Sequence, residues 1–126
     1  MIGMMADKAH AVAAREIAPL CAKVIATTPS NPRATPAEQL AREMEPFCSE
    51  VWAEENPEEA FLLALREAQP EDAVLVCGSF YLASDGARGT VAFFLHKFFA
   101  AFFQHSTKYA IEILYPDRVK ILFFEE

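Results

Sequence analysis

The sequence is poor in the residues that most small-molecule and metal sites need. It has only four glycines, three cysteines and three histidines in 126 residues. Neither glycine-rich phosphate motif, G-x-x-x-x-G-K-[ST] or G-x-G-x-x-G, occurs, and the G-x-S-x-G hydrolase motif is also absent. The cysteines and histidines have no metal-ligand spacing, so we predict no metal site. The odd cysteine count favours reduced core thiols at Cys21, Cys48 and Cys77.

Long apolar runs and excess positive charge are also lacking. No apolar stretch reaches the ~18–20 residues that cross a membrane, and the N-terminus lacks the basic start and apolar core of a signal peptide. The net charge is −7, with eight glutamates between Glu38 and Glu59. An acidic surface argues against nucleic-acid binding. We therefore predict a cytoplasmic protein with neither a nucleic-acid nor a membrane partner, and its 53% hydrophobic content excludes a disordered chain.

The stretch from Asp72 to Ser84 is the most informative segment. A short apolar run leads into Gly78 and Ser79 and then into a helix-compatible segment. This order is typical of a buried parallel strand followed by a helix, and ligands of such sheets bind at the carboxyl ends of the strands. Gly78 permits a turn or a close approach, and Ser79 places a hydroxyl at the helix start. An ordinary strand, turn and helix cap is the alternative interpretation.

The rest of residues 1–85 repeats the same alternation. Segments 1–5, 23–28, 50–53 and 74–77 read as strands, and the segments between them carry apolar residues at helical spacing. For the first helix the expected buried face is Ala9, Val12, Ala13, Ile17 and Leu20. For the second it is Ala37, Leu40, Ala41, Met44, Phe47 and Cys48. Thr35 is predicted to cap the second helix through a capping box, and Asn56 the third. The pattern predicts an α/β fold with a Rossmann-like, mostly parallel sheet flanked by helices.

The C-terminal part of the chain has a different composition. A helix-like segment contains Phe93, Phe94, Phe98, Phe99, Phe102 and Phe103. It is followed by two apolar segments, 109–115 and 118–124, which read as a β-hairpin. The phenylalanines are expected to form core or, if exposed, a surface for homo-oligomerisation. We place a domain at residues 1–88 and treat residues 89–126 as a tail that packs on it or extends it.

Several polar residues follow predicted strands and should share one rim of the sheet. They are Asp7, Asn31, Arg33, Ser79 and Tyr81. The Arg33 guanidinium could make paired hydrogen bonds to a carboxylate or phosphate, whereas Asn31 and Ser79 could orient polar substrate groups. The alternatives are that Arg33 closes its own loop and that Asp7 caps a helix beside a solvated Lys8.

Four segments, taken in order, carry a family resemblance. Residues 3–8, 17–20, 24–34 and 75–82, and above all NPRA at 31–34 and GSFYL at 78–82, resemble the C-terminal domain of folylpolyglutamate synthase (dihydrofolate synthase), in the Mur ligase superfamily. The resemblance covers about residues 2–88. It implies an ATP-dependent ligase that adds glutamate to folates, with ATP and Mg²⁺ as cofactors of the complete enzyme and glutamate and folate as substrates.

The same resemblance assigns roles to the rim. Ser79, Tyr81 and Arg33 would lie on the glutamate side of the site, and Asn31, Asp7 and Lys8 on the rim of the cleft between domains. The family's P-loop belongs to a central ATP-binding domain that is not in this sequence, and the DGAHNP segment that opens the family's C-terminal domain is also absent. We therefore expect a sheet without its first strand, no catalytic residue in this chain, no tightly bound cofactor and no turnover by the chain alone.

Two other classes of function stay open from the residues. A non-catalytic Rossmann-like interaction module could self-associate through the phenylalanine-rich segment, in which case a dimer should depend on residues 89–126. An independent small-molecule-binding domain should bind glutamate or a nucleotide by itself.

Overall fold

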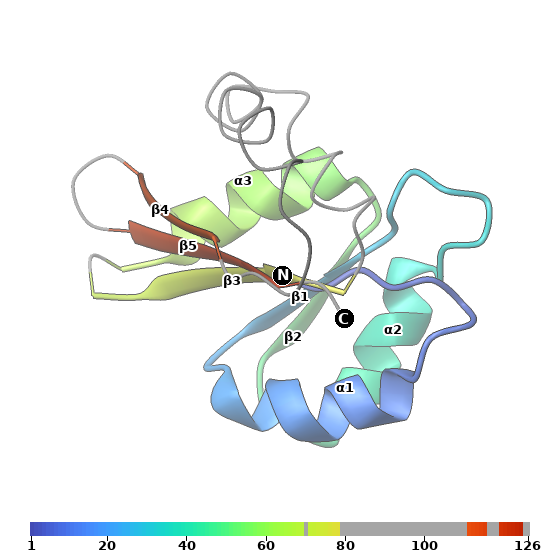
Figure 1. The fold of residues 1–126 in the computed structure, drawn as a ribbon. Helices are drawn as coiled ribbons and strands as arrows, with labels where there is room; N and C mark the ends of the chain where they lie inside the picture. The colour runs from blue at the N-terminus through green and yellow to red at the C-terminus, as the bar shows by residue number, and fades with distance from the viewer. Residues whose placement is uncertain (70, 79–110, 116–118, 125–126) are drawn as a thin grey trace.

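A single mixed sheet forms the centre of the molecule (Figure 1). The computed structural model describes residues 1–69, 71–78, 111–115 and 119–124, the last two ranges by their backbone. Strand β1 (Val24–Thr27) pairs in parallel with β2 (Val51–Glu54). Strand β3 (Ala73–Cys77) pairs in parallel with β5 (Val119–Phe124), which pairs antiparallel with β4 (Ile111–Tyr115). The predicted hairpin is thus confirmed, and it adds to the sheet beside β3.

Residues 1–3 join these two groups of strands. The Ile2 N–H donates to the Ile25 carbonyl (2.8 Å), and the Thr27 N–H donates to the Ile2 carbonyl (2.9 Å). On the other side, the Gly3 N–H donates to the Cys77 carbonyl (3.2 Å). Ile2 is bridged in parallel to both β1 and β3. The predicted strand end at the start of the sequence therefore lies between β1 and β3.

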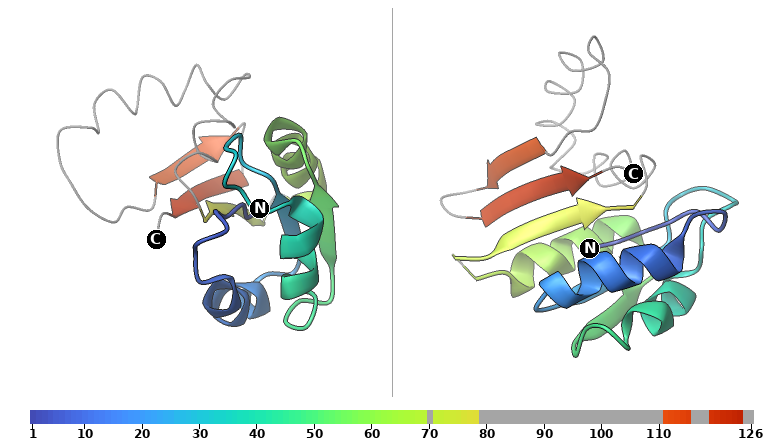
Figure 2. Two further views of the ribbon diagram at one scale, coloured as in Figure 1. Left: turned by 90° about the vertical axis from the view of Figure 1, so that its right-hand side faces the viewer. Right: turned by 60° about the horizontal axis from the view of Figure 1, so that its bottom comes forward.

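The helices cover both faces of the sheet. Helix α1 (His10–Ile17), extended by the 3₁₀ turn η1 (Ala18–Leu20), and α2 (Ala37–Met44) lie on one face, and α3 (Pro57–Glu67) lies on the other (Figures 1 and 2). The chain moves outward through α1 and α2 and returns across the sheet through α3, so right-handed crossovers require this division. The fold class expected from the sequence is confirmed; the helix expected after β3 lies outside the described residues.

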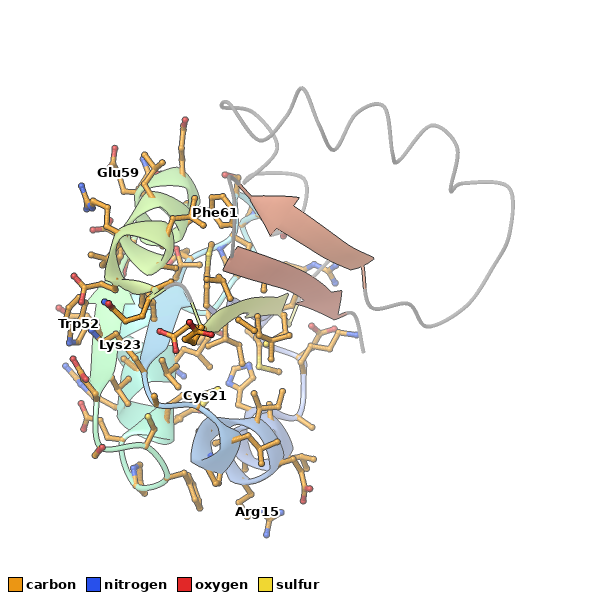
Figure 3. All side chains as sticks on the ribbon, turned by 90° about the vertical axis from the view of Figure 1, so that its left-hand side faces the viewer. Arg15, Cys21, Lys23, Trp52, Glu59 and Phe61 are labelled. Atoms are coloured by element: carbon orange, nitrogen blue, oxygen red, sulfur yellow. The ribbon has the colours of Figure 1, made fainter. Side chains whose placement is uncertain are left out.

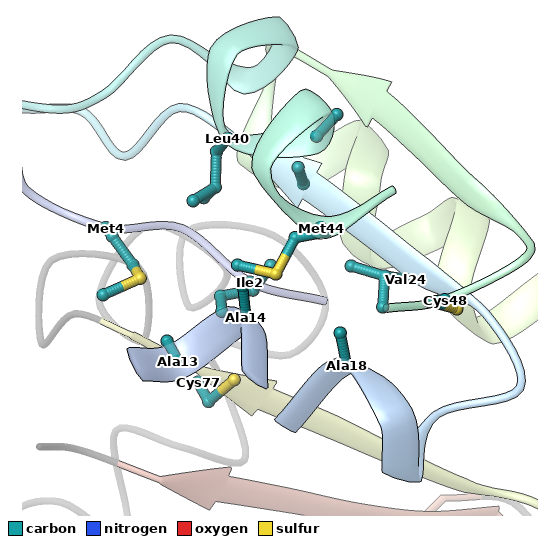
Figure 4. Packing of buried hydrophobic residues seen from close by; sticks show 12 residues of the cluster. Ile2, Met4, Ala13, Ala14, Ala18, Val24, Leu40, Met44, Cys48 and Cys77 are labelled. Atoms are coloured by element: carbon teal, nitrogen blue, oxygen red, sulfur yellow. The ribbon is translucent and has the colours of Figure 1, made fainter. Parts of the chain in front are cut away.

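A cluster of buried hydrophobic residues lies under α1 and α2 (Figure 4). Ile2, Val24 and Cys77 from the sheet pack there against Leu40 and Met44 of α2. Ile25 and Thr27, which alternate with Val24 and Ala26 along β1, face the α3 side. Both faces of β1 are therefore buried, which explains why its sequence is apolar without alternation.

The predicted face of α1 is correct at Ala13 and Ile17, which pack in the core, and wrong at Ala9, Val12 and Leu20, which are exposed. The residues that α1 and η1 bury are Ala13, Ala14 and Ala18, whereas Val12 is 42% exposed and Leu20 is 85% exposed. Small alanines let the helix backbone approach the strands closely, and that choice cannot be read from hydrophobicity alone. In the second helix the predicted face is correct except for Phe47, which lies beyond the helix end and is 38% exposed.

The end of the sheet where β1 and β2 begin is held by a lysine. The Lys23 ammonium contacts the carboxylates of Glu67 (2.6 Å) and Glu50 (2.9 Å) and lies 4.0 Å from the centroid of the Trp52 ring (Figure 3). Hydrogen bonds to Glu67 and Glu50 raise the pKa of Lys23. These contacts tie β1, β2 and the last turn of α3 together. No helix in the described part of the chain is long and apolar enough to cross a membrane.

The predicted boundary at residue 88 and the phenylalanine-rich segment both lie within residues 79–110, outside the described residues. The boundary stays a prediction, as does homo-oligomerisation through this segment.

Candidate functional site

The order of the strands places a topological switch point between residues 1–3 and β3. From residues 1–3 the chain continues through α1 to β1, on one side, whereas from β3 it continues to β4 and β5, on the other. Connections that leave two neighbouring parallel strands in opposite directions open a crevice outside their carboxyl ends. This crevice is the default ligand site of an open α/β sheet.

Two glycines allow the backbones to meet at this point. Gly78 has φ of +111°, and a Cβ built on it would lie 2.5 Å from the Gly3 carbonyl oxygen. A Cβ on Gly3 would lie 2.9 Å from Cγ of Pro29 and 3.1 Å from the Thr27 carbonyl oxygen. Any side chain at either position would force apart strand ends that now touch. The special backbone predicted at Gly78 is thus confirmed, whereas no local pattern singles out Gly3.

The loops that follow residues 1–3 and β1 are joined along the rim. The Ala6 N–H donates to the Arg33 carbonyl (2.8 Å), and the Thr35 N–H donates to the Met4 carbonyl (2.9 Å). Between these bonds, Met5 and Ala34 form an antiparallel bridge. The segment 4–8 and the loop 28–36, which we call the two rim loops, therefore form one surface.

Arg33 and Asp7 face each other across the joined rim loops. The Arg33 Nη1 lies 4.0 Å from Oδ2 of Asp7, and both side chains are about two-thirds exposed, at 69% and 66%. An exposed pair at this separation contributes little stability, so the guanidinium is available to another anion. Arg33 does not close its own loop by its side chain, which was the alternative interpretation.

The other predicted rim residues have more local roles. The Asn31 Oδ1 accepts the Arg33 N–H (2.9 Å), so this carboxamide oxygen shapes the loop instead of facing the crevice. Lys8 is exposed on the first rim loop. Asp7 does not cap α1, whose N-cap is Ala9 without a side-chain bond. Ser79 and Tyr81 lie outside the described residues, so their predicted place on the rim remains untested.

Comparison with known proteins agrees with this architecture. Residues 1–80 match the family model described as Mur ligase, glutamate ligase domain. The chain belongs to this Mur ligase family. Neither the curated proteins nor the solved structures gave a match. Membership covers all the strands and helices up to β3 and the whole described rim.

In this Mur ligase domain, the start of α2 is bound differently from the prediction. The α2 N-cap is Pro36, and the capping box at Thr35 does not form. Instead, the Ala37 N–H is accepted by Thr28 Oγ1 (2.8 Å) and by Glu55 Oε1 (3.1 Å), and the Thr28 hydroxyl also donates to the Glu55 carboxylate. Glu55 follows β2, so the same strand-end argument that selected Arg33 would have selected it.

A second group that sequence reasoning missed lies directly behind the rim. His10 is the first residue of α1, and its side chain is only 11% exposed. Its Nε2 lies 2.9 Å from the Met5 carbonyl oxygen and 3.2 Å from Thr35 Oγ1, and its Nδ1 lies 3.1 Å from Glu43 Oε2. Nothing in the local sequence distinguishes this histidine from a surface helix residue, because its three partners are distant in sequence or main-chain atoms.

The described rim of the Mur ligase domain carries the exposed guanidinium of Arg33. Arg33 keeps its charge at any physiological pH and presents paired N–H groups that match a carboxylate or phosphate. It lies on the rim loop that follows β1, at the carboxyl end of that strand. The arrangement suits positioning of an anionic ligand.

Proposed function

We propose that this chain is the C-terminal domain of a ligase of the folylpolyglutamate synthase (dihydrofolate synthase) type. The observation that carries the proposal is the exposed Arg33 guanidinium at the switch-point rim of a domain that belongs to the Mur ligase family. The order of the segments NPRA and GSFYL supports the folate-specific assignment.

The proposed reaction joins glutamate to a folate or pteroate carboxylate. ATP would supply the γ-phosphoryl group that turns this carboxylate into an acyl phosphate, with ADP released and Mg²⁺ offsetting the phosphate charge. The amino group of glutamate would then attack the acyl carbon, lose a proton and displace inorganic phosphate. Both cofactors would be held mainly by a central domain that is not in this sequence.

This chain would contribute the side of the site that closes over glutamate and the nucleotide. The permanent charge of Arg33 fits an anionic group in the cleft between domains. Ser79 and Tyr81 would complete the glutamate side, with Asn31, Asp7 and Lys8 forming the rim. Ligation depends on holding all reactants in one geometry, so the chain alone should show neither ATPase nor ligase turnover.

The test is complementation in trans. A folylpolyglutamate synthase truncated before its C-terminal domain is mixed with the purified 126-residue chain, and glutamate-dependent ADP release is measured with a folate substrate. We expect turnover only from the mixture. Arg33→Ala should reduce it by ~10–150-fold, the equivalent of about 1.5–3 kcal/mol for a lost charged hydrogen bond. Arg15→Ala, which removes an exposed arginine of α1, is the matched control and should leave the rate unchanged.

Three results would contradict the proposal in whole or in part. Turnover by the chain alone would show that the catalytic groups lie within it. Equal turnover by Arg33→Ala and the parent chain would reject the role of the guanidinium. If the mixture turns over with another amino acid in place of glutamate, the Mur ligase assignment holds and the glutamate specificity fails.

A further inference from the structure

His10 connects three parts of the domain through one imidazole ring. Its Nε2 contacts the Met5 carbonyl of the first rim loop and the Thr35 hydroxyl at the end of the second. Its Nδ1 contacts the Glu43 carboxylate on α2. Thr35 is 2% exposed, so these contacts form beneath the surface that carries Arg33 and Asp7.

The chemistry of these partners requires two ring protons. A carbonyl oxygen only accepts hydrogen bonds, and so does an ionised carboxylate. At 2.9 Å from the Met5 oxygen, Nε2 must carry a proton, because two facing lone pairs would repel. The Nδ1 atom lies 3.1 Å from the Glu43 carboxylate, an ion pair that exists only when the ring carries a second proton. Neutral imidazole carries one proton, so only the imidazolium satisfies both contacts at once.

The charged groups around the ring act in opposite directions. Glu43 faces it from α2 and favours the imidazolium, and α1 itself has no acidic residue in its first turn. From the rim loops the ring meets only the neutral Thr35 hydroxyl and the Met5 carbonyl. The positive end of the α1 dipole opposes a charge at this position. Loss of one proton would therefore release either the Met5 contact or the Glu43 contact.

We propose that His10 is a positioning residue that, when protonated, clamps the two rim loops together and so holds Arg33 in its anion-binding place. Anion binding by Arg33 rests on the proposed function, whereas the contact of His10 with both rim loops does not depend on it. Because Arg33 cannot lose its charge, any fall in anion affinity as the pH rises through neutrality would come from the clamp. The domain would thus bind its anionic ligand more tightly on the acidic side of neutrality.

The experiment follows the loops and the anion separately in the full chain by NMR. Hydrogen exchange of the Ala6 and Thr35 amides, which bond across the rim loops, reports on the clamp after correction for the intrinsic pH effect. Sulfate is the anion probe, because its charge is constant between pH 5.5 and 8. The variants are His10→Gln and Glu43→Gln, and Glu38→Gln is the control on the same helix, since Glu38 pairs only with the exposed Arg42 among described contacts.

We expect the parent chain to lose protection at Ala6 and Thr35 and to bind sulfate at least about threefold more weakly at pH 8 than at pH 5.5, as the competent population falls. Both His10→Gln and Glu43→Gln should remove this pH dependence, and Glu38→Gln should keep it. Glu43 is partly exposed, so its variant keeps the test valid if His10→Gln does not fold.

Different failures identify different errors. Protection at Ala6 and Thr35 that is independent of pH, or a pH dependence that survives Glu43→Gln, overturns the clamp. If protection behaves as expected but sulfate does not bind, or binds equally to Arg33→Ala, the clamp stands as a property of the loops, and the anion role of Arg33 in the proposed function is rejected.

Discussion

The contact between Gly78 and Gly3 gives the sharpest test of the switch-point geometry. In Gly78→Ala the new Cβ would lie 2.5 Å from the Gly3 carbonyl oxygen and 3.0 Å from Met4 Cγ, at a φ of +111°. The positive φ costs a non-glycine residue roughly 1–2 kcal/mol. Relief of the close contact should cost about 1–3 kcal/mol more, because the neighbouring oxygen belongs to the backbone of a paired strand.

Alanine also reduces the conformational freedom of the unfolded chain, which offsets ~0.4–1 kcal/mol of this loss of stability. The net loss in the free energy of unfolding should therefore be about 2–4 kcal/mol. For a chain of this size that corresponds to a fall in melting temperature of roughly 10 °C. Gly3→Ala is the companion variant. Its Cβ would meet mainly Pro29 ring atoms at 2.9 and 3.0 Å, and its φ is not positive, so its loss should be smaller.

The assay is urea unfolding followed by the fluorescence of Trp52, the single tryptophan, and by circular dichroism. Coincident transitions by the two probes would justify two-state treatment. A Gly78→Ala protein within 1 kcal/mol of the parent would refute the close approach of β3 to residues 1–3. A Gly3→Ala protein that is less stable than Gly78→Ala would also refute it, because only Gly78 has a positive φ and its Cβ contact is the closer one.

Three further predictions concern stability and the reactivity of a thiol. Lys23→Met should lower the melting temperature at pH 7. Because Glu67 and Glu50 raise the pKa of Lys23, the contribution of its charge to stability is complete below the ordinary lysine pKa and is lost as the pH rises through the raised pKa. The difference in melting temperature between parent and variant should therefore shrink at strongly alkaline pH. A constant difference would show that only packing was lost. Asn56→Ala should lower the free energy of unfolding by ~1 kcal/mol, measured by urea unfolding, since the Asn56 Oδ1 accepts two N–H groups at the start of α3. An unchanged free energy of unfolding would mean that the cap is not formed in solution. Burial raises the pKa of the Cys21 thiol, so an aromatic disulfide reagent at pH 8 should label it more slowly in the native protein than in urea; equal rates would contradict the packing of that cysteine against the core.

Much of the architecture followed from local patterns. Apolar segments at 23–28 and 74–77, separated by helical periodicity and by the Asn56 cap, were enough to predict a parallel sheet with helices on both faces. These patterns are local: a strand buried on both faces must be apolar throughout, and an asparagine before a helix satisfies its first amides. The rim position of Arg33 followed from the same reasoning, since parallel strands end at one edge.

Other features depended on residues distant in the sequence. The buried face of α1 was set by how closely alanines approach the strands, and the start of α2 was bound by Thr28 and Glu55 instead of Thr35. The pairing of β5 with β3 likewise involves segments more than forty residues apart, and no local pattern specifies such a partner.

The sequence by itself determined the class of fold and the charged rim, because strand, helix and cap preferences act over a few residues. Only the tertiary structure decided that residues 1–3 lie between β1 and β3, that Gly3 meets Gly78 at the switch point, and that His10 connects both rim loops. Those contacts arise when the helices dock and bring together atoms that the sequence keeps apart.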